Sequence, residues 1–126
     1  MALQIKLTGL LLLALVTSGC IREQQPVSFR NQVQPILVAN CVECHSAPAG
    51  KGYLKNGLSM ATYTDLMRGT IYGPVITPGD SRHSILNMLV EGRADSSMRM
   101  PHGRTPLTSQ EVHILRLWTE QGALPN

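Results

Sequence analysis

Aromatic residues are scarce in this sequence, and the shortage limits how a core can be built. One Trp, one Phe and three Tyr make up 4% of the 126 residues, whereas 43% are hydrophobic and 15% charged. The length suits one domain, and the hydrophobic content is that of a globular rather than a disordered chain. A domain of this size buries a modest core. With so few large rings to fill it, a bulky apolar cofactor in the interior becomes plausible.

Runs of one charge sign are also missing, as are internal repeats and low-complexity tracts. The formal net charge is +3, and one of its contributors, Lys6, lies in a segment that we expect to be removed. The basic residues are mostly scattered Arg, as on a solvated surface. This charge is too small and too dispersed to favour nucleic acid, so we expect no nucleic-acid partner.

No apolar run is long enough to span a bilayer. Residues 7–16 are almost wholly apolar, but about ten residues are too few for a membrane-spanning helix. Lys6 and the amino terminus precede this run, and the small residues Ser18 and Gly19 follow it. This is the layout of a secretory signal peptide. A buried core helix is the alternative, and the extreme N-terminal position disfavours it.

The residues before Cys20 make the export signal more specific. Residues 16–20, Val-Thr-Ser-Gly-Cys, resemble a bacterial lipoprotein lipobox, in which the Cys is acylated and becomes the first residue; Thr17 stands where Leu is usual. We therefore expect lipidation at Cys20 and a lipid anchor that holds the protein at a membrane without spanning it. The alternative is cleavage near Gly19 that leaves Cys20 as a free thiol.

These signals predict a simple organisation. Residues 1–19 are expected to be a lipoprotein signal peptide, residues 20–27 a tether and residues 28–126 one domain. The expected location is the periplasmic side of a bacterial membrane.

Cysteines number only three, which excludes a disulfide-rich scaffold. Cys41 and Cys44 stand two residues apart with His45 directly after, and Cys-Val-Glu-Cys-His is the attachment signature of c-type haem. One turn of chain places both thiols against the vinyl groups of one haem, and the adjacent imidazole points at the iron. A thioredoxin-type site lacks the surrounding βαβ pattern, and a zinc site lacks a second ligand pair. We therefore predict one covalent haem c, with His45 as axial ligand.

The second axial ligand is less well marked. Met opposite His is common in electron-transfer haems and raises the reduction potential. Met98 and Met100 lie on an irregular loop late in the chain, where a thioether can reach over the distal face, and Pro101 stiffens the chain there. We predict Met100, with Met98 as the alternative and His102 less favoured. The other methionines are expected in the core and the remaining histidines near the surface: Met60, Met67 and Met88, and His83 and His113.

Helical patterns mark both ends of the expected domain. Ser28 is a candidate cap for a helix over 28–40, in which Pro35 is expected to produce a kink. Thr108 with Glu111 forms a capping-box pattern for the last helix, which Gly122 ends. Trp118 lies on the apolar face of that helix.

Between these ends the patterns are weaker. Residues 46–57 contain Pro48 and three glycines and are predicted to be a loop, with a small positive cluster at Lys51 and Lys55. A short helix is predicted between Thr62 and Gly69. Another is predicted to start at Asp80 or Ser81, bury Ile85, Leu86 and Leu89, and end at Gly92. Short strands are conceivable at 58–60 and 75–77.

In combination, these residues resemble a class I monohaem cytochrome c domain of the planctomycete type. The resemblance implies an all-α cytochrome c fold, three to four short helices around one haem and at most a two-stranded sheet. It implies crossing terminal helices, with Trp118 packed against the first helix or the haem. It maps the Met of the family's Met-Pro pair onto Met100. The residues that carry the resemblance are Phe29, residues 33–37, 41–45 and 73–80, Ser84, residues 99–101, Leu107, Thr108, Glu111, Leu115, Trp118, and residues 122–123.

Two departures from that pattern are visible. His102 stands where a second Pro is frequent, and the loop at 46–57 is long. Arg99, Arg104 and Tyr72 are weak candidates for contacts with the haem propionates.

The expected function is single-electron transfer between a redox donor and a redox acceptor, without catalysis. His/Met ligation leaves no open coordination position on the iron, and the sequence shows no second redox site. One alternative is a haem-bearing subunit of a larger oxidoreductase complex. Another is a sensor or peroxidase in which the distal ligand dissociates.

Overall fold

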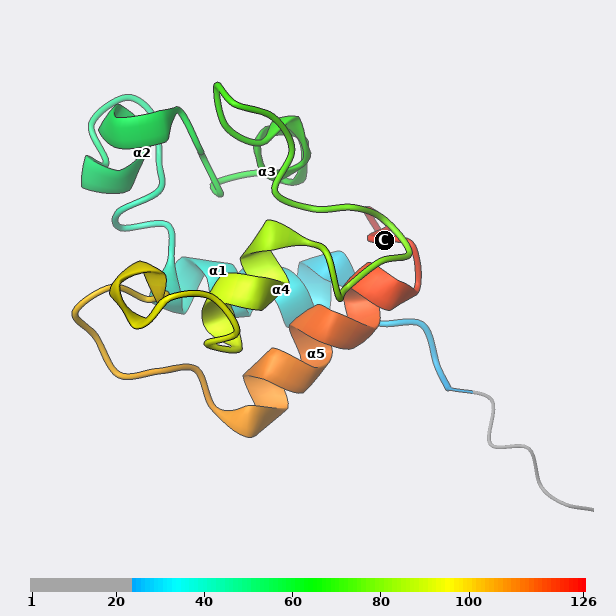
Figure 1. The fold of residues 1–126 in the computed structure, drawn as a ribbon. Coiled ribbons are helices and arrows are strands. Elements are labelled where there is room, and N and C mark those ends of the chain that lie inside the picture. Colours follow the sequence, from blue (N-terminus) through cyan, green and yellow to red (C-terminus); the bar gives the residue numbers. More distant parts are fainter. Residues whose placement is uncertain (1–23) are drawn as a thin grey trace, which may run out of the picture.

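The computed structural model describes residues 24–126, and these form an all-α domain (Figure 1). The prediction of an all-α cytochrome c fold is confirmed, although five α-helices form rather than three or four. They are α1 (Gln34–Asn40), α2 (Lys51–Asn56), α3 (Tyr63–Arg68), α4 (Ile85–Val90) and α5 (Ser109–Glu120), with the π-helix η1 (Phe29–Val33) and the 3₁₀ turn η2 (Ser96–Met98). Cys20 and the predicted signal peptide lie outside the described residues.

The first helix begins where its cap predicts. The Ser28 hydroxyl accepts a hydrogen bond from the Asn31 backbone N–H at 3.2 Å. The helical run changes from the π-helix η1 to the α-helix α1 just before Pro35, which occupies the first turn of α1. Because η1 directly precedes α1, Pro35 lacks the N–H that would donate to a carbonyl of the preceding turn, and the kink itself stays a prediction.

The last helix follows its local signals closely. The Thr108 hydroxyl accepts from the Glu111 N–H at 3.2 Å, and the Glu111 carboxylate accepts from the Thr108 N–H at 2.7 Å. These two bonds complete the predicted capping box. The helix ends at Glu120, two residues before Gly122, whose φ is +100°.

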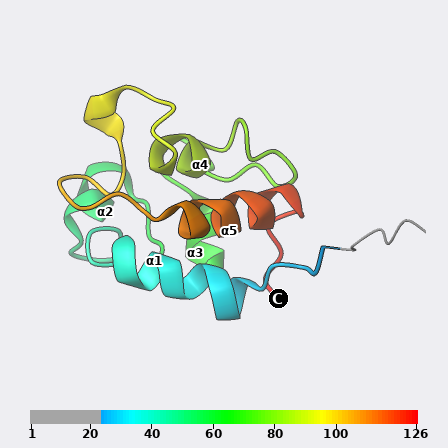
Figure 2. The same cartoon turned by 90° about the horizontal axis from the view of Figure 1, so that it is seen from below.

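The terminal helices pack together, as Figure 2 shows for η1, α1 and α5. The Phe29 ring lies 5.5 Å from the ring of Trp118 and 5.2 Å from the ring of Tyr63, measured between centroids. Trp118 is 1% exposed, and its indole donates to the Leu124 carbonyl at 2.9 Å. Trp118 therefore fills the contact with the first helix and does not line the large cavity described below.

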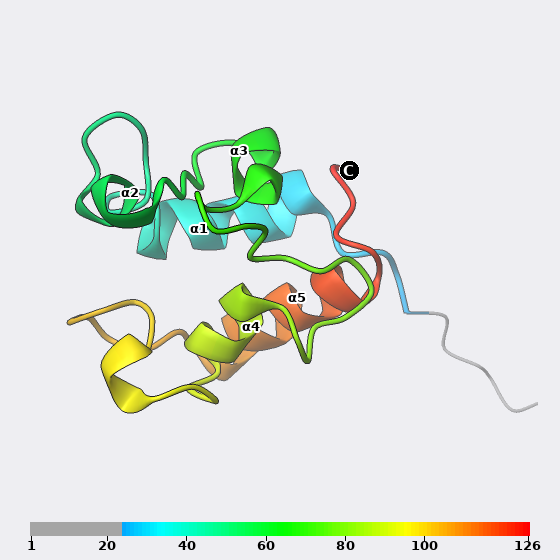
Figure 3. The ribbon, with the colours of Figure 1, turned by 45° about the horizontal axis from the view of Figure 1, so that its top comes forward.

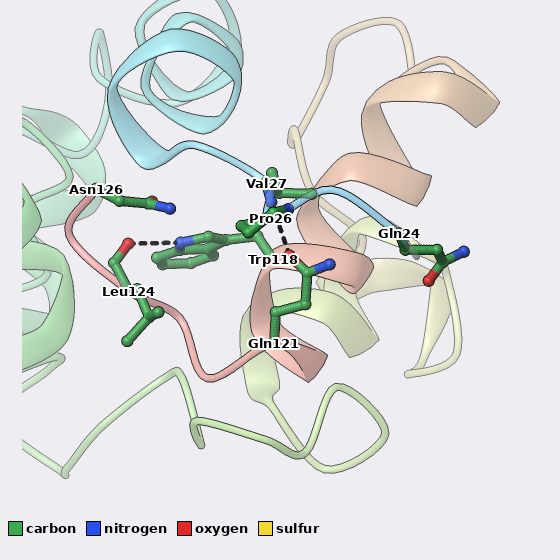
Figure 4. Close-up of a pocket in the computed structure, with 7 residues that line it drawn as sticks. All are labelled: Gln24, Pro26, Val27, Trp118, Gln121, Leu124 and Asn126. Atoms are coloured by element: carbon green, nitrogen blue, oxygen red, sulfur yellow. Dashed lines mark hydrogen bonds between the residues drawn. The ribbon is translucent and has the colours of Figure 1, made fainter. Parts of the chain in front are cut away.

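The N-terminal residues of the described chain join this contact. A small pocket of about 200 Å³ is lined by Trp118 and by residues that include Gln24, Pro26 and Val27. Figure 4 shows Pro26 and Val27 next to Trp118, with Gln24 farther from the ring. The Val27 N–H donates to the Gln121 side-chain oxygen at 2.7 Å. Val27 is buried, one residue before the predicted start of the domain. The chain thus enters the domain beside the end of α5.

Three predictions in the middle of the chain are wrong. Residues 51–56 of the predicted loop form α2, a helix whose amide groups Gly52 and Tyr53 donate to the Cys44 carbonyl. No strand forms at 58–60 or 75–77, and within residues 24–126 the β-structure is one isolated bridge between Thr70 and Gly73.

The start of α4 is the third error. Its N-cap is Ser84 rather than Asp80 or Ser81. Asp80 instead accepts from the His83 N–H at 3.0 Å and caps the preceding turn. Leu86 is buried as predicted, whereas Ile85 is 47% exposed. The α3 prediction is confirmed, with Thr62 as its cap and Gly69 at its end.

Candidate haem site

A cavity of about 720 Å³ lies beside the Cys-Val-Glu-Cys-His segment. This volume is in the upper part of the range for ligand pockets. In Figures 1 and 3, α2 and the segment around η2 lie at the end of the molecule away from the C-terminus, and residues from both line the cavity. Its apolar wall comes mainly from α4 and the segments before it: Leu58, Met60, Val75, Ile85, Leu86, Leu89 and Val90.

The two cysteines of the motif line this cavity. Cys41 is the C-cap of α1 and is 8% exposed, whereas Cys44 is exposed; both are free thiols. Burial raises the pKa of the Cys41 thiol to about 11, and the nearby Arg104 guanidinium partly opposes this shift. Cys41 is therefore a neutral thiol at ordinary pH, and the turn after α1 presents it beside Cys44.

Hydrogen bonds within this turn and just before it hold its conformation. The Cys44 and His45 N–H groups donate to the Cys41 carbonyl at 3.1 and 2.8 Å. Just before it, the Asn40 amide donates to the Glu111 carboxylate at 3.2 Å. The capping box of α5 thus also holds the end of α1, next to the first thiol.

His45, the predicted axial ligand, lines the cavity with the two cysteines. Burial lowers the pKa of its imidazole. A neutral imidazole is the form that binds iron. Its Nδ1 is buried without a hydrogen-bond partner in the described residues. Gly52 lies against the ring, because a Cβ there would stand 2.5 Å from Cε1.

The two methionine candidates differ in burial. Both line the cavity, but Met98 is 54% exposed at the end of η2, whereas Met100 packs partly buried against the core. The Met100 N–H donates to the Leu89 carbonyl of α4 at 3.2 Å. His102 also lines the cavity and is exposed. The geometry favours Met100, and its ligation stays a prediction.

The two other histidines lie outside the cavity, and two other methionines are buried or packed against the core. His83 is exposed and its Nδ1 lies 2.7 Å from Asp80; His113 is also exposed. Neither lines the cavity. Met60 is buried as expected but contributes to the cavity wall, and Met67 packs against the core.

Several lining residues were not predicted as part of the site. Lys51, Lys55 and Asn56 come from α2, which sequence patterns assigned to a loop. Among the weak propionate candidates, Tyr72 and Arg104 line the cavity and Arg99 does not. Arg104 pairs with Glu43 at 3.0 Å, a contact between the haem motif and the loop after Met100. The sequence had marked Lys51 and Lys55 as a positive cluster, but not as part of the site.

These features fit a covalent haem. Two thiols, a neutral imidazole with an unpaired buried nitrogen, a thioether and apolar walls surround one cavity. Within residues 24–126, no group of three His, Cys, Asp or Glu side chains gathers that is able to hold a bare metal ion. None of the described helices is long and apolar enough to cross a membrane.

Comparisons with known proteins agree with this site. Residues 41–102 match the family described as Planctomycete cytochrome C. A solved structure titled Kuenenia stuttgartiensis Hydrazine Synthase is similar, with a TM-score of 0.50 and 25% identity. The match covers 82% of this chain but only 17% of that one. No curated protein matches. The resemblance inferred from the sequence is therefore confirmed over residues 41–102, which match the planctomycete cytochrome c family.

Proposed function

We propose that the protein is a monohaem electron carrier, with the haem attached through Cys41 and Cys44. His45 and Met100 are then the axial ligands. The main support for this proposal is that all four side chains line one cavity with mostly apolar walls. One Cys-x-x-Cys-His occurs in the sequence, which supports a single haem. When bound, the haem supplies a one-electron iron couple.

The surrounding residues would tune this couple and limit its chemistry. A thioether opposite an imidazole raises the reduction potential and fills the sixth position. The apolar wall from α4 excludes water from the iron and disfavours the extra charge of the ferric form. With both axial positions filled, electron transfer is favoured over binding of small molecules.

The direct test is the absorption spectrum and voltammetry of the protein produced with haem-attachment machinery. We expect a low-spin spectrum, a reversible one-electron couple, and no complex of the ferrous form with carbon monoxide. A high-spin ferric spectrum with rapid carbon monoxide binding would favour the sensor or peroxidase alternative instead.

We propose that the protein acts on the periplasmic side of a bacterial membrane, held by lipid at Cys20. The support is the lipobox-like sequence and the short apolar run before it. Mass spectrometry of the mature N-terminus tests this proposal. An acylated Cys20 is expected, and an unmodified Cys20 or a cleavage elsewhere rejects the anchor.

A second candidate function is that of a haem-bearing module in a larger redox complex. It is favoured by the similarity to hydrazine synthase, in which the matched part is 17% of a longer chain. Native mass measurement of the protein purified from its own cells separates the two. A free monomer supports the carrier, and a stable complex with an oxidoreductase supports the module.

A further inference from the structure

Helix α2 is poorly supported by its own sequence. It has six residues, Lys51–Asn56, with no buried residue and no side-chain cap at its start. Gly52 lies within it, and an internal Gly costs about 1 kcal/mol relative to Ala. A helix this short is marginal without tertiary contacts. Contacts outside the helix must therefore hold it in place.

The two lysines of α2 add to this problem. Lys51 and Lys55 are four residues apart, which places both on one face of the helix, and both line the cavity. Like charges at this spacing repel by about 0.2–0.5 kcal/mol. Neither lysine enters an ion pair among residues 24–126. An anion inside the cavity would remove the repulsion.

The charge of the cavity wall points the same way. Its charged residues are three cations, Lys51, Lys55 and Arg104, with no carboxylate among the lining side chains. Arg104 is already matched by Glu43, whose Oε2 lies 3.0 Å from its Nη1. The unmatched positive charge therefore lies on the α2 side. The Ile71 N–H donates to the Asn56 carbonyl at the end of α2 at 2.9 Å. The next residue, Tyr72, also lines the cavity.

We infer that Lys51 and Lys55 bind the two propionate carboxylates of the haem and so hold α2 over the His45 ring. This inference rests on the proposed function, because the propionates are the only carboxylates that a haem brings. Charge-assisted hydrogen bonds from ammonium to carboxylate are stronger than neutral ones. The same contacts keep Gly52 against the imidazole, so the lysines position the proximal ligand through the helix.

The arrangement has a consequence for the iron. Reduction adds one negative charge to the haem, and nearby cations favour the reduced form. Cations paired with the propionates also offset the negative charge that these groups place near the iron. Loss of Lys51 or Lys55 is therefore expected to lower the reduction potential.

The test uses the haem-loaded protein with Lys51→Gln, Lys55→Gln and both together. Arg30→Gln is the matched control, because Arg30 is an exposed cation outside the cavity wall. At a fixed potential, each single variant should raise the ferric-to-ferrous ratio several-fold, and the double variant about tenfold, equal to about 59 mV for one electron. The amide protons of α2 should also exchange faster in the double variant.

Charge-keeping variants make the outcome specific. Lys51→Arg and Lys55→Arg should retain the potential and the slow exchange of α2, even if the double Gln variant fails to load haem. If the Gln variants match Arg30→Gln in potential and exchange, the propionate assignment is wrong. Covalent haem in the unmodified protein is checked first, so that failure of the proposed function is seen separately.

Discussion

Gly52 lies so close to His45 that position 52 has no room for a side chain. A Cβ there would stand 2.5 Å from Cε1 and 2.7 Å from Nδ1 of the imidazole. Real Cβ atoms do not approach other atoms so closely, so the ring or helix α2 would have to move. The position of helix α2, which the sequence predicted to be a loop, therefore constrains the orientation of His45, the candidate iron ligand.

Gly52→Ala tests this contact. In a helix without tertiary contacts, the change would stabilise by about 1 kcal/mol. Here we expect the opposite sign, with lower thermal stability and an altered haem spectrum because His45 is displaced. Leu54→Ala, at an exposed position of the same helix, is the control and should leave the spectrum unchanged. A more stable Gly52→Ala variant with an unaltered spectrum would disprove the contact.

The capping box of α5 gives a prediction about pH. Hydrogen bonds from the Thr108 backbone and hydroxyl lower the pKa of the Glu111 carboxyl. Because the folded pKa lies below the unfolded one, the stabilisation is present above the ordinary Glu value of about 4.3 and is lost as the pH falls through the folded value.

Thr108→Ala should therefore cost about 1 kcal/mol at neutral pH, as loss of an N-cap usually does, and less in acid. Urea unfolding at several pH values measures the difference. Ser109→Ala, at an exposed neighbouring position, is the control. An equal loss at neutral and acid pH would show that the carboxylate does not depend on this cap.

Phe29 joins the two ends of the chain through its contacts with Trp118 and Tyr63. Phe29→Ala should destabilise the fold by about 3–5 kcal/mol, because it opens a cavity between buried rings. Urea unfolding followed by Trp118 fluorescence reports the change directly. Val38→Ala, 57% exposed in α1, should have little effect. Similar stabilities of the two variants would show that the ring cluster is not central to the core.

The two methionines are separated by volume-conserving changes. Met100→Leu should abolish the weak far-red band that reports a methionine–iron bond, whereas Met98→Leu should keep it. The physical reason is that Met100 is partly buried and tied to α4, whereas Met98 is mostly exposed. The reverse result moves the ligand to Met98. A protein that lacks this band before any substitution would turn attention to His102, and a band kept in both variants would point to another methionine.

The sequence predicts those parts of the structure whose signals are local. The Thr108 and Glu111 pair starts α5 and Gly122 follows its end, since capping depends on residues a few positions apart. The Cys41 to His45 segment is equally local, and it was identified without the fold. Helix α2 was missed because the three glycines of residues 46–57 predict a loop, whereas the amides of Gly52 and Tyr53 donate to the Cys44 carbonyl.

Long-range contacts at the site had no local signature. The Glu43–Arg104 pair joins positions 61 residues apart, and the Asn40–Glu111 hydrogen bond joins positions 71 apart. Likewise, Met98 and Met100 look alike in sequence, and only the packing of the loop against α4 distinguishes them. Three-dimensional packing, rather than residue type, decides such choices.

The central claim is that Cys41 and Cys44 carry the haem. Mass spectrometry of a proteolytic peptide that contains both cysteines and His45 tests it most directly. We expect the peptide to retain one haem through two thioether bonds, and Cys41→Ala with Cys44→Ala to abolish the attachment. A peptide with two free thiols or a Cys41–Cys44 disulfide, from protein made under haem-attaching conditions, would contradict it.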